Sequence, residues 1–393
     1  MASKVIFAST QDSDMRYAVK TPITSSFFYV ETKGKKYAFL DKVDFGTICP
    51  SKGLTLGNSP TSSRGRKRSN LETIPLEPLA KEARKLKFQT SNRNKLAYYI
   101  FKKYKLLGRE VEVPIHFPLD MADFLRKKGA KLVPTFPFFP ERAVKTEEEI
   151  EYIKECLAHT RLAFRIIENI LRTSEISARG RFAFGEKIYY KNKVLTSEFL
   201  KQEAEKALIE KGMFDLLGMI ISTGEQTAVP HHDGTGPIHP HRPVVCDIFP
   251  RHRKSGYFAD MTRTFVKGKP SPEIQKMYAA VLKAQLAAMK KIRAGMSAKE
   301  IYDVATDIIS KEGYDVGEKG FIHGLGHGVG LDIHEKPSLK PHSEDVLEAG
   351  NVITIEPGLY YPKVGGIRIE DMVLVTKTGC KNLTNYPKKL IIP

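Results

Sequence analysis

Five side chains that can ligate metal ions follow one another along the last third of this 393-residue chain. Each lies in a short apolar or glycine-rich segment, which would restrict the movement of its side chain. A fold that uses all five must bring widely separated strands and turns together within a few ångströms. The five residues are Asp247, Asp260, His327, Glu356 and Glu370.

The chemistry of these ligands predicts a dinuclear metallohydrolase. Four carboxylates and one imidazole form an oxygen-rich set that suits two divalent cations of the manganese, cobalt or zinc type. Two such ions about 3.5–4 Å apart can share a hydroxide and stabilise a tetrahedral intermediate. We expect Asp260 and Glu370 to bridge the two ions.

Each of the five residues has an ordinary structural explanation when it is considered alone. An aspartate after an apolar run, such as Asp247, commonly ends a strand or opens a turn. His327 could be a hydrogen-bonded histidine in a glycine-rich turn. The combination favours metal binding because Glu356 and Glu370 fall in β-branched strand patterns, where a carboxylate is costly unless something pairs with it.

Four sequence blocks resemble the pita-bread metallopeptidases, the family of methionine aminopeptidase, prolidase and aminopeptidase P. The resemblance is strong over roughly the last two thirds of the chain and looser before it. Several unrelated blocks in the same order are a more specific signal than one short motif. The blocks are Gly256–Phe265, His323–Glu335, Ile355–Tyr360 and Gly366–Asp371.

The resemblance implies a metal-dependent exopeptidase whose two metal ions are held by the five residues above. Manganese is the expected metal, with cobalt or zinc as alternatives. The resemblance also implies that His231 and His334 stand beside the metals and act in catalysis by contacting the substrate. His323 and Arg368 are expected to line the same pocket and to bind the substrate.

One departure from the family lies between the two aspartates. Twelve residues separate Asp247 from Asp260, two more than is usual, and Phe249 stands where the family usually has a glycine. The basic stretch Arg251–Lys254 falls in this segment and predicts a longer hairpin turn. A hairpin can absorb two residues while both strand ends stay in register, so we expect both ligands to be retained.

Two domains are predicted, an α/β domain over residues 1–145 and an α+β pita-bread catalytic domain over residues 146–393. Residues 5–45 alternate as strands do and include a hairpin that turns at Lys33–Lys35. Later segments of the first domain alternate helix and strand. A similar N-terminal domain accompanies prolidase and aminopeptidase P. Thr146, followed by acidic residues, is a strong start signal for a long helix.

The second domain shows an order of elements that suggests an internal duplication. Two helices and a strand pair are followed by two more helices and another strand pair, without any repeat of sequence. We therefore expect a curved antiparallel sheet with an internal pseudo-twofold and helices on its outer face. The predicted helices cover residues 146–171, 197–211, 273–292 and 298–311.

The net charge of +18 is concentrated in the first domain. Residues 1–145 hold 28 Lys and Arg against 13 Asp and Glu, a balance of +15, whereas the remainder holds 35 against 32. The densest run, Arg64–Arg68, lies in a Ser- and Asn-rich stretch. No nucleic-acid-binding motif accompanies it, so we predict a solvated loop without specific affinity for nucleic acid.

Other bulk properties suggest a cytoplasmic protein. The four cysteines have no zinc-like spacing, and the N-terminus lacks the apolar centre of a signal peptide. The chain has no apolar run of about 18 residues, so no membrane span is expected. The resembling proteins suggest a homodimer.

Within the resembling family, the size of the N-terminal domain argues against a simple methionine aminopeptidase. We favour a Xaa-Pro aminopeptidase, which releases the N-terminal residue from short peptides with proline in the second position. A Xaa-Pro dipeptidase (prolidase) is the alternative. An interaction protein on the same scaffold, or a metal-independent amidine hydrolase of the creatinase type, would have no use for five intact ligands.

Overall fold

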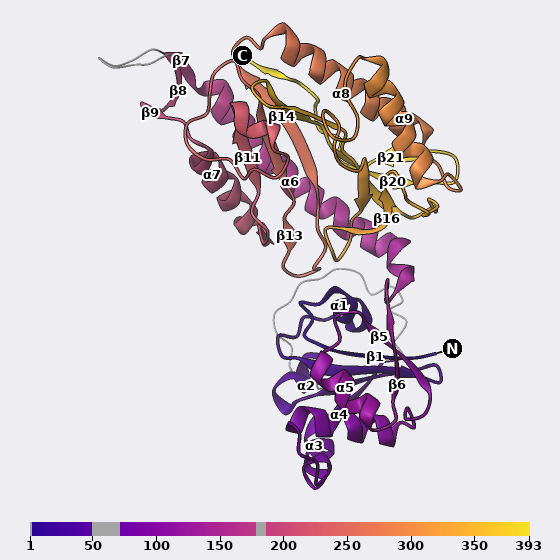
Figure 1. Ribbon diagram of the computed structural model, residues 1–393. Helices are drawn as coiled ribbons and strands as arrows, with labels where there is room; N and C mark the ends of the chain where they lie inside the picture. Colours follow the sequence, from indigo (N-terminus) through magenta and orange to yellow (C-terminus); the bar gives the residue numbers. More distant parts are fainter. Residues whose placement is uncertain (1, 49–70, 178–185) are drawn as a thin grey trace. The chain divides into compact units, whose positions relative to one another are not determined.

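A computed structural model describes residues 2–48, 71–177 and 186–393, and the chain divides into two compact units, Met1–Pro140 and Glu141–Pro393 (Figure 1). We expected the boundary after residue 145, but residues 141–145 belong to the second unit. There the Lys145 amide donates to the Gly350 carbonyl at 2.9 Å. The basic run Arg64–Arg68 lies outside the described residues.

The first unit contains a six-stranded sheet in the order β4-β3-β2-β1-β5-β6. The β1–β2 and β2–β3 pairs are antiparallel, and the other three pairs are parallel. The strands are β1 (Ser3–Ala8), β2 (Phe27–Thr32), β3 (Lys35–Leu40), β4 (Leu71–Pro75), β5 (Glu110–Pro114) and β6 (Lys131–Thr135). The helices are α1 (Ser13–Val19), α2 (Lys42–Ile48), α3 (Leu76–Arg84), α4 (Asn92–Lys103) and α5 (Leu119–Lys127), followed by the 3₁₀ turn η1 (Pro140–Ala143).

Strand β2 is apolar on both faces because both faces of this sheet are covered. Successive side chains of a strand point to opposite faces. Phe28 and Val30 accordingly pack into the core that includes residues of α3, α4 and α5, whereas Phe27 and Tyr29 pack into a second core with Met15 of α1.

The hairpin predicted around Lys33 is confirmed, with Lys33 and Gly34 both at positive φ, as a two-residue hairpin turn requires. The strand alternation expected through residues 5–45 is wrong at Ser13–Val19, which forms α1. The Asp12 carboxylate accepts a hydrogen bond from the Met15 amide at 2.8 Å, so side-chain capping favours a helix there.

The second unit is built on two larger sheets, β11-β12-β14-β22 and β16-β15-β17-β20-β21. Their strands are β11 (Ile220–Thr223), β12 (Val244–Ile248), β14 (Met261–Lys267), β22 (Ile391–Ile392), β15 (Gly326–Gly328), β16 (Glu335–Leu339), β17 (Val352–Ile355), β20 (Asp371–Val375) and β21 (Cys380–Asn382). The shorter strands are β7 (Glu175–Ser177), β8 (Lys187–Tyr190), β9 (Lys193–Val194), β10 (Met213–Phe214), β13 (Arg251–His252), β18 (Gly358–Tyr361) and β19 (Gly365–Arg368).

The two larger sheets meet where β14 lies beside β19 and the start of β20. The Glu370 amide donates to the Thr262 carbonyl at 3.1 Å. The Thr264 hydroxyl donates to the Arg368 carbonyl at 2.8 Å and accepts from the Arg368 amide at 3.0 Å. This junction joins the two halves of the unit and brings the ligand-bearing strands together.

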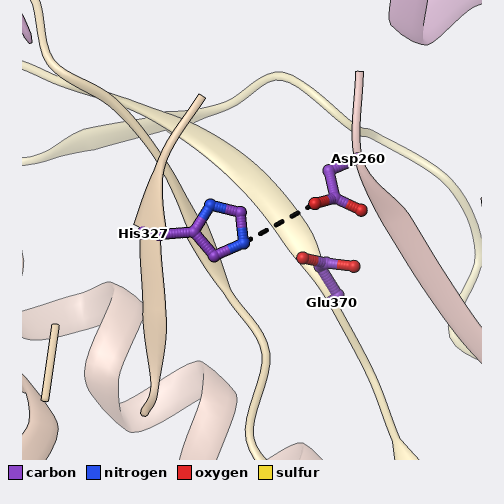
Figure 2. A group of neighbouring side chains, drawn as sticks. All are labelled: Asp260, His327 and Glu370. Atoms are coloured by element: carbon purple, nitrogen blue, oxygen red, sulfur yellow. Dashed lines mark ion pairs between the residues drawn. The ribbon is translucent and has the colours of Figure 1, made fainter. Parts of the chain in front are cut away.

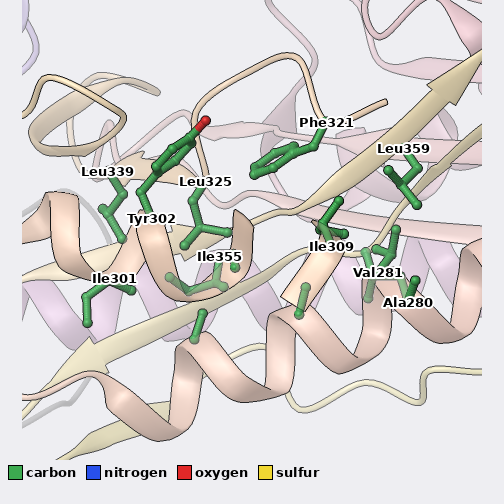
Figure 3. Packing of buried hydrophobic residues seen from close by; sticks show 14 of the residues in the cluster. Ala280, Val281, Ile301, Tyr302, Ile309, Phe321, Leu325, Leu339, Ile355 and Leu359 are labelled. Atoms are coloured by element: carbon green, nitrogen blue, oxygen red, sulfur yellow. The ribbon is translucent and has the colours of Figure 1, made fainter. Parts of the chain in front are cut away.

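Helices cover the sheets of the second unit (Figure 1). Helices α8 and α9 pack together and against the strands of the second half, and Figure 3 shows Val281 of α8 and Ile309 of α9 in the core that includes Ile355 and Leu359. Helix α6 lies against β14 and β22, and Thr146 begins it with the predicted side-chain cap. The helices are α6 (Glu147–Thr173), α7 (Ser197–Glu210), α8 (Pro272–Lys291) and α9 (Ala298–Lys311), with the 3₁₀ turn η2 (Gly224–Ala228).

None of the helices in the described part of the chain has both the length and the apolar character needed to cross a membrane.

Candidate metal centre

Three of the predicted ligands converge at the junction of the two sheets. Asp260, His327 and Glu370 each offer one ligand atom, and these atoms lie within 4.8 Å of one another (Figure 2). They come from three segments: the residue before β14, strand β15, and the residue before β20. Asp260 and Glu370 are buried, at 4% and 2% exposed.

Strand register explains how residues far apart in sequence meet here. Asp247 lies opposite Thr262 in the β12–β14 pair, and Asp260 is two residues before Thr262, so all three share one face of the sheet. Ile355 lies opposite Asp371 in the β17–β20 pair. Antiparallel pairing therefore brings the two glutamates that adjoin these residues, Glu356 and Glu370, to the same end of the sheet.

The imidazole of His327 is oriented for binding through Nε2. Its Nδ1 lies 3.1 Å from the Gly328 carbonyl, which can only accept, so Nδ1 carries the hydrogen. Its Nε2 lies 3.7 Å from Asp260 Oδ2. A backbone–carbonyl bond of this kind is the usual second contact of a metal-binding histidine. Strand β15 lies so close to β17 that a Cβ at Gly326 would be 2.0 Å from the Thr354 carbonyl oxygen.

Glu356 and Asp247 complete the set of five. Glu356 Oε1 lies 3.2 Å from His327 Nε2. Asp247 Oδ2 accepts from Arg368 Nη2 at 2.7 Å, and Asp247 is near enough for its charge to raise the pKa of Asp260 and Glu370. The second oxygen of Asp247, Oδ1, is buried without a hydrogen-bond partner among the described residues.

The electrostatics of this cluster fit a bound cation. Burial and the surrounding carboxylates raise the pKa of Asp260 and of Glu370 well above the ordinary values. Burial opposes the charge of His327, but Glu356 and Asp260 nevertheless raise its pKa to about 9. Carboxylates that repel one another in a buried site, one of them with an unpartnered oxygen, are the donors that divalent metal ions neutralise.

The hairpin predicted between the two aspartates is present, and the strands on either side stay in register. His252 of β13 donates its amide to the Tyr257 carbonyl at 2.9 Å, and Arg251 forms an antiparallel bridge with Phe258. The β12–β14 pairing is continuous from Val244 to Ile248. The additional residues therefore lie in the turn, and the two strands keep a continuous register.

The two predicted catalytic histidines lie beside the cluster. The ring of His334 is perpendicular to the ring of His327, with the centroids 4.2 Å apart. Although His334 is exposed, desolvation of its ring where it packs against His327, together with the charge of His327, lowers the pKa of His334. His231 is exposed, and the Pro230 carbonyl before it accepts from Arg368 Nη1 at 3.2 Å.

The residues predicted to bind substrate, Arg368 and His323, belong to one buried network. Arg368 is 3% exposed, and its guanidinium donates to Asp247, Thr262 and the Tyr360 hydroxyl. His323 Nδ1 lies 2.7 Å from the Gly324 carbonyl, so Nε2 is left to accept from Tyr360 Oη at 2.9 Å. The network therefore connects His323 through Tyr360 and Arg368 to the candidate ligand Asp247.

Sequence reasoning missed several residues of this network. Tyr360 stands in a block that resembles the family, but nothing in the pattern assigned it a partner. Thr262 donates its hydroxyl to Glu370 Oε2 at 2.8 Å, and Thr354 donates to Glu356 Oε1 at 3.2 Å. Each of these threonines lies two residues from a predicted ligand, Asp260 or Glu356, and the alternation of a strand would place it on the same face.

The fold and the site together fit the expected class, the metal-dependent peptidases. The sequence profile of metallopeptidase family M24 matches residues 159–377, more than half of the chain. The chain belongs to metallopeptidase family M24. The family is one of metallopeptidases, which implies divalent metal ions at the site.

Relatives and solved structures agree with this assignment. A Xaa-Pro dipeptidase from Pyrococcus furiosus is 39% identical over 255 residues, which span 64% of this chain and just 65% of that relative. The prolidase structure from Pyrococcus horikoshii covers 100% of this chain and 96% of its own at a TM-score of 0.74 and 26% identity. The X-Pro aminopeptidase structure from Thermotoga maritima covers 100% of this chain and 98% of its own, at a TM-score of 0.76 and 22% identity. The expected pita-bread fold is confirmed.

Proposed function

We propose that this enzyme hydrolyses the bond before proline in short peptides, and that Xaa-Pro dipeptides are its preferred substrates. The peptidase chemistry is supported by the convergence of Asp260, His327 and Glu370. The choice of dipeptides is supported by the 39% identical relative, which is named as a Xaa-Pro dipeptidase. Sequence analysis alone favoured the aminopeptidase, so this proposal reverses the order of the two alternatives.

The five residues predicted from the sequence would hold the metal ions, for which manganese is our first choice. Asp260, His327 and Glu370 would hold the ions at the junction of the two sheets, where their ligand atoms lie within 4.8 Å of one another. The unpartnered oxygen of Asp247 would supply one more ligand atom. When bound, the ions supply Lewis-acid chemistry and an activated water at neutral pH.

The two exposed histidines predicted to be catalytic, His334 and His231, would act directly on the substrate. The ring of His334 is exposed and packs beside the candidate ligand His327, so one of its ring nitrogens would donate a hydrogen bond to the scissile carbonyl oxygen. That bond would strengthen as negative charge develops on the oxygen. His231, exposed on the segment held by Arg368, would contact the substrate as well.

We assign Arg368 to orienting Asp247 instead of binding substrate. Its guanidinium is buried, and Nε, Nη1 and Nη2 all donate to protein atoms. A buried arginine with its donors occupied holds a carboxylate in one orientation. His323 and Tyr360 support this arrangement from behind, because the Tyr360 hydroxyl accepts from Arg368 and donates to His323.

Hydrolysis of a Xaa-Pro dipeptide and of a Xaa-Pro-Yaa tripeptide by the metal-loaded enzyme tests the proposal. We expect kcat/KM to be higher for the dipeptide, and a Xaa-Ala dipeptide to be cleaved poorly. A higher kcat/KM for the tripeptide, with release of its first residue, would restore the aminopeptidase assignment. Failure to cleave either proline peptide in manganese, cobalt or zinc would refute both assignments.

A further inference from the structure

The loop Val329–His334 connects β15 to β16 and carries His334 to the metal centre. Gly328 lies opposite Glu335 where the register of the two strands shifts, and the loop spans the residues between them. The ring of His334 returns to pack edge-on against His327. Because His334 itself is exposed, something other than its own burial must hold the loop in this conformation.

The carboxylate of Glu335, the next residue, is bound to the loop from inside the protein. Its Oε1 accepts the amides of Leu331 at 2.9 Å and Asp332 at 3.0 Å. These two bonds close the loop on itself. The side chain is 6% exposed, although the adjacent His334 lies at the surface.

Two cations from a segment far away in sequence neutralise this carboxylate. Lys145 Nζ donates to Glu335 Oε2 at 2.9 Å, and Arg142 Nη2 lies 2.5 Å from Oε1. Arg142 Nη2 also lies 2.7 Å from Asp332 Oδ2, so it binds a second point of the loop. The lysine side chain is 1% exposed and the arginine side chain 12%.

A buried ion cluster of this kind is a poor source of stability. The cost of removing the charges from water commonly offsets their attraction, and apolar replacements of similar volume are often as stable. Such a cluster can instead hold the loop Val329–His334 in one particular conformation. Gly330 fits this interpretation, because a Cβ there would lie 2.6 Å from a Glu335 carboxylate oxygen. The space around the carboxylate is therefore shaped by the loop that it binds.

We propose that Glu335, Arg142 and Lys145 are positioning residues that hold His334 beside the metal centre. Since the role of His334 belongs to the proposed function, this inference rests on that proposal. A displacement of about 1 Å at a reacting group can reduce a rate about a hundredfold. The cluster would thus act on catalysis without any of its members contacting the substrate.

The test replaces the buried lysine in two backgrounds. Lys145→Met should lower kcat by about tenfold to a hundredfold while metal content and KM stay near wild type. In the His334→Ala background the same replacement should have almost no effect on kcat, because the group that it displaces is already gone. Arg142→Gln, at a less buried position, should behave in the same way and serves if Lys145→Met folds poorly.

Lys267→Met is the matched control. Lys267 is also a buried lysine of the second unit, and its Nζ donates to the Arg172 and Pro393 carbonyls. The Lys267→Met variant should have a lower melting temperature, but its kcat below that temperature should equal that of the wild type. An equal loss of kcat in Lys267→Met, or an undiminished effect of Lys145→Met in the His334→Ala background, would show that the cluster is only structural.

A spectroscopic measurement separates this inference from the proposed function. In the zinc-loaded protein, the imidazole ¹H–¹⁵N signals of His334 are assigned by their loss in His334→Ala. Lys145→Met should shift or broaden these signals, and Lys267→Met should leave them unchanged. An unchanged His334 signal in Lys145→Met would overturn the inference even if the enzyme is active, whereas a shifted signal in an inactive protein would overturn only the proposed function.

Discussion

Three of the four candidate carboxylate ligands are each held by a donor that binds one carboxylate oxygen. Thr262 binds Glu370, Thr354 binds Glu356, and Arg368 binds Asp247. Such contacts behind the ligands set their orientation and commonly decide metal affinity. The residues that touch the metal are therefore only part of what makes the site.

Replacing Glu370 by Gln should abolish turnover because metal binding is lost. The amide keeps the shape of the side chain but removes the negative charge that two cations would share. Metal analysis of the purified variant, beside peptide hydrolysis, measures both effects. Glu344→Gln, which changes an exposed glutamate, is the control. A Glu370→Gln variant that keeps two metal equivalents would remove this residue from the set of ligands.

Replacing His334 by Ala should leave both metals bound and lower kcat. Loss of one acid–base or hydrogen-bonding group at the reacting centre typically costs roughly 10²–10⁴-fold in rate. The ring contacts His327 edge-on and is exposed, so its removal should not disturb the ligands. Metal loss in this variant would instead make His334 a ligand.

At the scale of elements, helix α8 ties the two glutamate-bearing strands together from the side opposite the metals. Gln285 is fully buried, and its Nε2 donates to the Ile355 carbonyl at 2.9 Å and to the Ile369 carbonyl at 3.1 Å. These carbonyls belong to the residues directly before Glu356 and Glu370. One side chain thus fixes the spacing of both ligands.

Gln285→Leu should lower the free energy of unfolding by about 1–3 kcal/mol, because two buried carbonyls lose a donor. It should also weaken metal retention by relaxing the two strands. Urea unfolding and metal titration measure the two effects. Gln275→Leu in the same helix, where the amide binds only the Pro270 carbonyl and is exposed, should change neither.

The contribution of Glu335, the residue after His334, to the free energy of unfolding should depend on pH. Burial alone would raise the pKa of Glu335, but Lys145 and Arg142 lower it below the ordinary value. A carboxyl with a lowered pKa in the folded state contributes stability above its unfolded pKa, about 4.3, and loses it as pH falls. Glu335→Gln should therefore be less stable than wild type at pH 7, with the difference shrinking below about pH 4. A difference that stays constant across this range in urea unfolding would contradict the argument.

The sequence predicted the long helices and the candidate ligands that the structure brings together, but not the contacts that support them. Asp260 and Glu370 stand in contiguous sequence blocks, and Thr146 forms a local helix cap with Glu149. Sequence patterns could therefore predict these two ligand candidates and the start of this helix. Gln285 could not, because its partners lie in other strands and depend on how the helix packs. Helix α1 was missed for a related reason: its start depends on the Asp12 cap, whereas the surrounding apolar residues alternate like strands.

At the scale of the whole molecule, the two units differ in charge and in their share of the chemistry. Residues 1–140 hold 26 Lys and Arg against 12 Asp and Glu, a balance of +14 within the net charge of +18, whereas all five candidate ligands lie in the second unit. The absence of specific nucleic-acid binding and the homodimer both stay predictions. The basic run Arg64–Arg68 lies outside the described residues.

Metal removal should loosen the second unit alone. A ligand that binds only the folded state stabilises the elements that hold it, so chelation should increase hydrogen exchange in β12, β14, β17 and β20. The sheet of the first unit contains no predicted ligand, and its protection should stay unchanged. Exchange measured by mass spectrometry with and without chelator tests this, and equal loosening of both units would show that their stabilities are coupled.

Strand β14 also has a consequence for biosynthesis. Its outer edge is paired in parallel with β22, where Val266 lies opposite Ile391. Because β22 follows every candidate ligand in the sequence, the end of β14 at Val266 and Lys267 stays open to water and to other unpaired strands until Ile391 and Ile392 have been made. Chains that stop short of β22 should accordingly be more prone to aggregate through this open edge than chains that include it.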